Sequence, residues 1–169
     1  LSIISKIAEA TIAQAAAVDK AGAAYAKSTG FGREFDGMLS ATNHSMKRFN
    51  VNAEDVGKGL VSLRTGLSQF KNLTAETQQN LLNTVVGLEK LGVATDDSTQ
   101  VLNNLTKALG MSESKAADLT REIALSGQAL GMTASKITKE FNSALGTLAV
   151  YGDKSTKVFM KLASMAQVA

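Results

Sequence analysis

The sequence predicts an all-α fold, in which one long Ala-rich, coiled-coil-like helix precedes about seven short helices packed as a compact bundle. Three observations support this fold class. The 169 residues contain no proline, which breaks helix interiors by removing a backbone donor and clashing with the preceding turn. Apolar residues recur with the period of a helix. Short Gly-, Asn-, Ser- and Thr-containing phrases interrupt these apolar runs every 17 to 22 residues.

The first predicted element is the long helix, which spans residues 1–30 and forms the first of two domains. STGFG (Ser28–Gly32) ends it, because glycine favours conformations that break a helix. Small residues along one side allow another helix to approach closely, so we expect a seam at which copies of the chain meet. The seam residues are Ile3, Ile7, Ala10, Ala17, Ala21 and Ala24.

Residues 31–169 are expected to form the multi-helix bundle, with helix joints near residues 50, 72, 93, 111, 132 and 152. At a joint, Gly or Asn tolerates the left-handed conformation that ends a helix. A small polar residue then caps the next helix by accepting a hydrogen bond from a free amide. The predicted joint residues are Asn52, Thr74, Gly92, Thr95, Gly110, Ser112, Gly131, Thr133 and Asp153.

Between the joints, each segment carries an apolar stripe at helical spacing. Helices of this length are marginal alone, so the stripes must be buried against one another. In chain order, the stripes are Phe35, Leu39, Met46 and Phe49; Val56, Leu60, Leu63, Leu67 and Phe70; Leu81, Leu82, Val85, Leu88 and Leu91; Leu102, Leu105 and Leu109; and Ile137, Phe141, Ala144 and Leu148.

Two nearly identical octapeptides, ALGMSESK (Ala108–Lys115) and ALGMTASK (Ala129–Lys136), lie 21 residues apart. They could be one binding motif used twice, or one helix joint that occurs twice. We interpret them as joints, because the glycine stops one helix, the methionine packs across the next first turn, and Ser or Thr caps it. The chain is therefore expected to fold back over residues 109–133.

The residues indicate no catalytic, cofactor or metal site, and we expect a protein that is not an enzyme and uses no cofactor. The chain has no cysteine and a single histidine, His44, which is too few for a metal site or a catalytic triad. GTLAVYGDKST (Gly146–Thr156) echoes a phosphate-binding loop, but its spacing differs and it follows a helical stripe instead of a strand.

The charge pattern also limits the partners. The 18 basic and 15 acidic residues are spread along the chain, whereas a nucleic-acid interface clusters its positive charge. We therefore expect no sequence-specific nucleic-acid partner. Lys6, Glu9 and Gln14 interrupt the apolar opening segment well short of the ~20 residues of a membrane span, so a soluble protein is expected.

The order of a long Ala-rich helix, joints of this kind and the stretch GQALGMTASKITKEFNSALGTL (Gly127–Leu148) resembles bacteriophage tail tape measure proteins. The resemblance implies a piece of a long, mostly helical virion protein in the lumen of the tail, assembled in the host cytoplasm. Such proteins set tail length, contact the tube and the tip or baseplate, and leave before or with the DNA, and we expect this piece to plug the tail tube near the tip or baseplate.

The resemblance also implies partners. These are other copies around the tail axis, the tail tube, and tail-tip or baseplate hub proteins, with membrane contact only during ejection. A ruler needs unbroken helix, which suits residues 1–27, whereas the joints suit a folded plug at the end of the rod.

Two other classes of protein stay open. A membrane-active or translocated helical protein, such as a pore-former or secretion translocator, would carry a hydrophobic hairpin or a strongly basic amphipathic face, and neither is evident. The other class is a helical adaptor. The irregular joint spacing argues against a true helical solenoid within that class.

Overall fold

The computed structural model describes residues 3–168, so Leu1, Ser2 and Ala169 of the predicted domains lie outside the described residues. Every regular element within that range is helical, which confirms the all-α prediction. The elements are α1 (Ile3–Thr29), α2 (Asp36–Met46), η1 (Lys47–Phe49), α3 (Ala53–Gly66), η2 (Phe70–Asn72), α4 (Ala75–Glu89), α5 (Thr95–Lys107), α6 (Glu113–Ala129), α7 (Ala134–Leu148), η3 (Ala149–Lys154) and α8 (Ser155–Val168), where η denotes a 3-10 helix.

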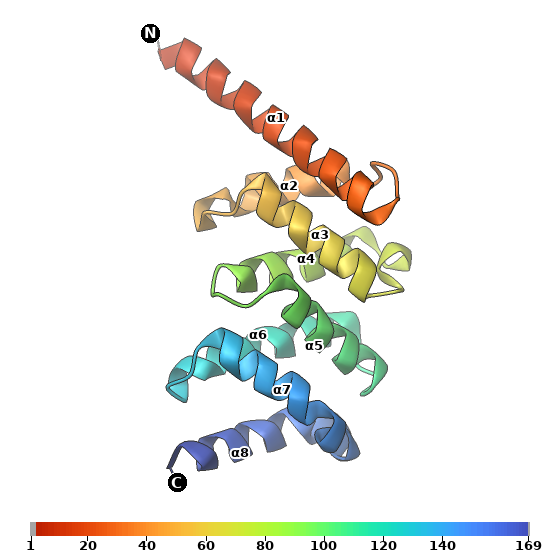
Figure 1. Ribbon diagram of the computed structural model, residues 1–169, viewed down its shortest axis with the longest axis vertical. Coiled ribbons are helices and arrows are strands. Elements are labelled where there is room, and N and C mark those ends of the chain that lie inside the picture. Colours follow the sequence, from red (N-terminus) through yellow and green to blue (C-terminus); the bar gives the residue numbers. More distant parts are fainter. Residues whose placement is uncertain (1–2, 169) are drawn as a thin grey trace.

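The α-helices stack in two layers along the length of the molecule, and the two termini lie at opposite ends (Figure 1). α1, α3, α5 and α7 form one layer, and α2, α4, α6 and α8 form the other. Among residues 3–168, the pairs of α-helices in substantial contact lie one or two places apart in the chain. This packing on near neighbours is the architecture of an α-solenoid.

The expected bundle therefore takes a layered form, and the argument against a solenoid from irregular spacing is wrong. Helices of 11 to 17 residues build the stack from α2 to α7. Each buries its apolar stripe on its neighbours whatever its length, and the connections absorb the differences. A short 3-10 helix lengthens some of these connections, whereas others contain only a few turn residues.

The joints at the two octapeptides have the conformation that the sequence predicts. Gly110 and Gly131 adopt left-handed backbone angles, with φ of 63° and 65°. The amide of Met132 then donates to the carbonyl of Gly127 (2.8 Å), which closes the end of α6. Because α6 packs against both α5 and α7, the fold-back over residues 109–133 is confirmed.

Four predicted caps lie at helix N-termini and accept a hydrogen bond from the backbone amide three residues later. The bonds are Asp55 N–H to Asn52 (3.0 Å), Thr77 N–H to Thr74 (3.2 Å), Lys115 N–H to Ser112 (3.4 Å) and Lys136 N–H to Thr133 (3.1 Å).

The predicted cap at Thr95 is wrong by one residue. Ala94 occupies the N-cap position of α5 and makes no side-chain cap hydrogen bond, while Thr95 is the first helical residue. The reason is that LGVAT repeats the backbone geometry of LGMT. Gly92 has φ of 86°, and the next amide, that of Val93, donates to the carbonyl of Leu88 (3.1 Å). The cap position therefore falls two residues after the glycine, where this joint has alanine.

Two other joints also differ from the expected pattern. Asp153 lies inside η3 instead of capping α8. The bend is at Gly152, with φ of 55°, and the hydroxyl of Ser155 donates to the carbonyl of Leu148 (2.7 Å). Near residue 72, η2 turns the chain, and the left-handed residues of the structure do not include Asn72.

The predicted stripes build most of a continuous core. Val56, Leu60 and Leu63 of α3 are fully buried. Phe49 and Leu91 are the exceptions, since both are about half exposed. Phe49 falls in η1 and Leu91 follows α4, so both lie in connections between α-helices.

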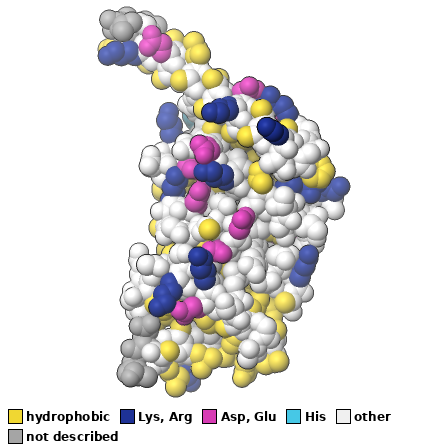
Figure 2. All heavy atoms as spheres, viewed as in Figure 1, with side chains coloured by type: hydrophobic (Ala, Val, Ile, Leu, Met, Phe, Trp, Pro, Cys, Tyr) yellow, Lys and Arg dark blue, Asp and Glu magenta, His cyan; other side chains and the backbone are white. Residues whose placement is uncertain are grey.

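The prediction of a coiled-coil-like rod is not matched. α1 spans 27 residues and packs against α2 and α3. Its Ala21 and Tyr25 belong to the same core as the following helices. Only the N-terminal half of α1 stands clear of the stack (Figures 1 and 2).

Candidate functional site

A groove of about 820 Å³ lies between α1 and α3 and reaches the start of α5. Small residues line much of it because the two helices approach closely. A Cβ atom at Gly57 would lie 3.5 Å from the Cβ of Ala21. The small residues of the lining are Ala17, Ala21, Ala24, Ala53 and Gly57.

Charged residues of both signs lie among the residues that line this groove. Lys20 comes from α1, Glu54 and Lys58 from α3, and Asp96 from α5. Lys58 and Glu54 form an exposed ion pair, with Nζ and Oε1 2.9 Å apart. The groove thus combines an apolar lining with charges of both signs, as the core and rim of a protein interface do.

A buried polar atom lies at the Tyr25 end of the groove. Tyr25 is 2% exposed, and the side chains of Thr29 and Arg64 lie near its buried hydroxyl. Burial raises the pKa of this hydroxyl. The hydroxyl oxygen is fully buried, so a molecule in the groove would not reach it.

Near the same end of α1, Arg64 packs on the ring of Phe31. Arg64 of α3 is 9% exposed, and its Cζ atom lies 3.8 Å from the centre of the Phe31 ring. Its Nε atom has no hydrogen-bond partner among the described residues. This stacking holds the loop after α1 against α3 by a cation–π interaction.

The exposed half of α1 is the second candidate surface. Ile3, Ile7 and Ile12 are 77%, 61% and 70% exposed. Ile3 and Ile12 lie nine residues apart, which places them on nearly opposite sides of a helix with about 3.6 residues per turn. A helix that is apolar on more than one side is normally buried. This half of α1 therefore presents large apolar side chains to solvent on two of its sides.

The structure divides the predicted seam between these two surfaces. Ile3, Ile7 and Ala10 lie on the exposed half of α1. Ala17, Ala21 and Ala24 line the groove, and Ala21 is already buried. That copies of the chain meet at this seam stays a prediction.

Two carboxylates meet a lysine where α3 and α4 pack. The backbone amide of Asn52 donates to the carboxylate of Asp55 (2.9 Å), and Lys90 Nζ lies 2.6 Å from the same carboxylate. Burial alone would raise the pKa of Asp55, but these hydrogen bonds outweigh it and lower the pKa. Burial and the nearby charge of Asp55 raise the pKa of Glu89.

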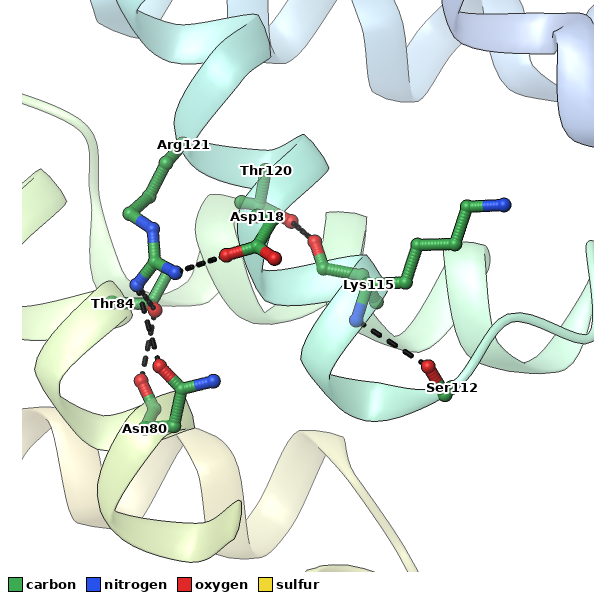
Figure 3. A network of polar contacts seen from close by, with 8 residues as sticks. Asn80, Thr84, Ser112, Lys115, Asp118, Thr120 and Arg121 are labelled. Carbon is green, nitrogen blue, oxygen red and sulfur yellow. Dashed lines mark hydrogen bonds and ion pairs between the residues drawn. The ribbon is translucent and has the colours of Figure 1, made fainter. Parts of the chain in front are cut away.

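A polar network joins α4 to α6 in the middle of the stack (Figure 3). The guanidinium of Arg121 donates to the hydroxyl of Thr84 (2.7 Å) and to the side chain of Asn80 (3.4 Å). It also pairs with Asp118 on its own helix. The polar side chains at this contact therefore hold α4 and α6 together.

Hydrophobic side chains gather at the C-terminal end of the stack (Figure 2). They include exposed residues on η3 and α8, where the stack has no further helix among the described residues. The large exposed side chains there are Val150, Tyr151, Leu162 and Met165.

Sequence reasoning missed the groove, the Arg64–Phe31 stacking and the Arg121 network. Each needs the relative placement of helices, which no local pattern encodes. The role of Asp55 had a local signal, since Asn52 and Asp55 have the spacing of a capping box.

His44 and the segment Gly146–Thr156, which the sequence analysis did not interpret as functional sites, lie on helices and their connections. His44 is exposed on α2. Gly146–Thr156 forms the end of α7, η3 and the start of α8. Among residues 3–168, no three His, Cys, Asp or Glu side chains are grouped so that they could hold a metal ion. No helix in the described range has the length and apolar character needed to cross a membrane.

The chain matches no protein-family model, and neither a curated protein nor a solved structure is similar to it. The candidate surfaces on the described residues are the groove, the exposed half of α1 and the apolar C-terminal end.

Proposed function

We propose that this chain is a structural part of a phage tail tape measure protein, at the point where a helical rod passes into a folded plug near the tail tip or baseplate. The observation that carries the proposal is the layout of α1. Its N-terminal half leaves the molecule as a single exposed helix, and its C-terminal half is packed into the stack. In this proposal, α1 belongs to both the rod and the plug.

The reversals after α1 support a plug instead of a ruler in this part of the chain. Residues 31–169 drawn out as one helix would span roughly 200 Å at about 1.5 Å per residue. The chain instead reverses at the left-handed joints and stacks its helices side by side. These residues therefore add bulk, and they add little to the length of a ruler.

Deleting residues 31–169 from the parent tape measure protein tests this proposal. Tail length is measured by negative-stain electron microscopy, and the protein content of virions by mass spectrometry. We expect the segment in wild-type virions, and a length change far below 200 Å in tails that assemble without it. Absence of the segment from purified virions would refute the virion role, and a shortening near 200 Å would refute the plug.

A helical adaptor is the second candidate, and the two-layer stack favours it. Solenoids present extended surfaces on which partner proteins bind, and the groove between α1 and α3 is such a surface. The virion measurement separates the two candidates, since an adaptor of the host cell would be absent from purified particles.

A further inference from the structure

We propose that the groove between α1 and α3 binds the exposed half of α1, residues 3–16, from a second copy of the chain. This inference rests on the self-association that belongs to the proposed function, but not on the location of the protein in a virion. In the predicted seam, the same residues of two copies meet. Here the N-terminal half of α1 in one copy meets the groove beside the C-terminal half of α1 in the other.

The shapes of the two surfaces fit each other. One face of the exposed half of α1 carries the bulky Ile3 and Ile7, whereas alanine and glycine line much of the groove. Bulky side chains fill the space above small ones, so two helices can pack without voids. Two grooves placed face to face would leave small residues opposite small residues, and two exposed halves would leave Ile opposite Ile.

The lengths agree as well. Residues 3–16 form a helical segment of about 20 Å at roughly 1.5 Å per residue. The groove follows α1 from Ala17 to Ser28 and α3 from Ala53 to Ser62, which is a comparable distance at the same rise. One helical segment can therefore occupy the groove along its length.

The polar groups provide complementary contacts. The exposed half of α1 carries one cation, Lys6, and one anion, Glu9, three residues apart and so on neighbouring positions of the helix. Lys58 and Glu54 of the groove pair with each other on α3, which leaves Lys20 and Asp96 of the lining as partners of opposite sign for Glu9 and Lys6.

Part of the predicted seam is unavailable for a contact between equivalent residues. Ala21 is buried by the packing of α1 in its own chain. A second helix that runs along Ala17 and Ala24 must therefore contact α3 as well as α1. Each copy carries both a donor segment and a groove, so the contact is exchanged within a pair, passed around a closed ring or continued along an open filament.

Disulfide cross-linking tests the contact directly, because the natural chain has no cysteine. An affinity-tagged Ile7→Cys chain is mixed with untagged chains that carry Ala17→Cys, Lys58→Cys or Ala24→Cys, and the mixtures are oxidised. We expect a tagged–untagged cross-link for at least one groove position, in at least fivefold excess over the Ile7–Ile7 product. A dominant Ile7–Ile7 product, or no cross-link, would overturn the inference.

Substitutions that block each surface provide the second test. Ala24 lines the groove and is exposed, so Ala24→Leu fills the groove, and Ile7→Asp places a charge on the donor segment. Ala23→Leu is the matched control, because Ala23 is exposed on α1 and does not line the groove. Self-association is measured by sedimentation equilibrium, and folding by circular dichroism.

We expect Ala24→Leu and Ile7→Asp to weaken self-association by at least tenfold with unchanged helicity, and Ala23→Leu to change it by less than twofold. A monomeric wild-type chain at all concentrations, or equal effects of Ala24→Leu and Ala23→Leu, would overturn the inference. Those results would leave the virion measurement unaffected, so the two proposals fail separately.

Discussion

Asp55 and Glu89 show how two carboxylates in one region acquire opposite pKa shifts. Asp55 receives hydrogen bonds from Lys90 and from the amide of Asn52 that outweigh its burial, so its pKa is lowered. Its folded-state pKa lies below the unfolded value, so it contributes stability above the unfolded pKa and loses it as the pH falls through the folded pKa. Glu89 is destabilised as an anion by burial and by Asp55, and its pKa is raised.

Glu89→Gln should therefore stabilise the protein at neutral pH. The raised pKa means that the ionised carboxylate costs stability once the pH exceeds the folded-state value, and this cost disappears below the ordinary Glu pKa of about 4.3. We expect a gain of less than about 1 kcal/mol at pH 7 and none near pH 4 in urea denaturation. Glu122→Gln, at an exposed site on α6, is the control. An equal gain at both pH values would contradict this account.

Substitutions at Gly110 and Gly146 distinguish the effect of backbone strain on stability from the effect of steric crowding. A Cβ atom would meet no other atom within 4 Å at either position, but Gly110 has φ of 63° whereas Gly146 lies within α7. Gly110→Ala should cost about 1 kcal/mol, because an L-residue disfavours the left-handed region. Gly146→Ala should gain up to about 1 kcal/mol, since alanine is the better helix former. Equal effects in thermal melts would show that the left-handed joint is not maintained in solution.

At this scale, local chemistry predicted most of the joints. Thr74, Ser112 and Thr133 each cap a helix. The hydroxyl of each accepts a hydrogen bond from the free backbone amide three residues later. The register failed at Ala94, where the backbone geometry continues although the side chain offers no acceptor. Residue preferences alone do not show that the turn before α5 forms without a capping side chain.

Individual helices owe their stability to buried stripes, and α3 is the clearest case. Leu63→Asp should destabilise the chain by at least about 3 kcal/mol, because it combines the loss of a buried side chain with an unpaired buried charge. Leu125→Asp is the control, since Leu125 is 52% exposed on α6, and it should cost less than about 1 kcal/mol. Both are measured by chemical denaturation. A tolerated Leu63→Asp would show that the α3 stripe is not buried.

The helix stripes were predictable because burial repeats with the helical period. The partners of each stripe were not, because a stripe does not specify which helix covers it. α1 illustrates the difference. Its small-residue seam was visible in the sequence, but the covering of Ala21 within its own chain depends on the close approach of α3 at Gly57.

The whole molecule behaves as a linear array in which each helix depends on near neighbours. Stability in such an array is close to a sum of local terms and contacts between adjacent units. Both ends leave large apolar side chains exposed. The sequence predicted the number and order of the helices better than their layers, because layering follows from contacts between neighbouring helices.

Hydrogen exchange followed by mass spectrometry at several protein concentrations tests most directly the claim that α1 is the interaction element of a neighbour-packed stack. In dilute solution, we expect amides of residues 3–16 to exchange fast and those of α3 to α5 to exchange slowest. As concentration rises, protection should increase at residues 3–16 and at Ala17–Ser28, with little change in α4 and α6. Exchange at residues 3–16 that is slow in dilute solution, or independent of concentration, would contradict the account.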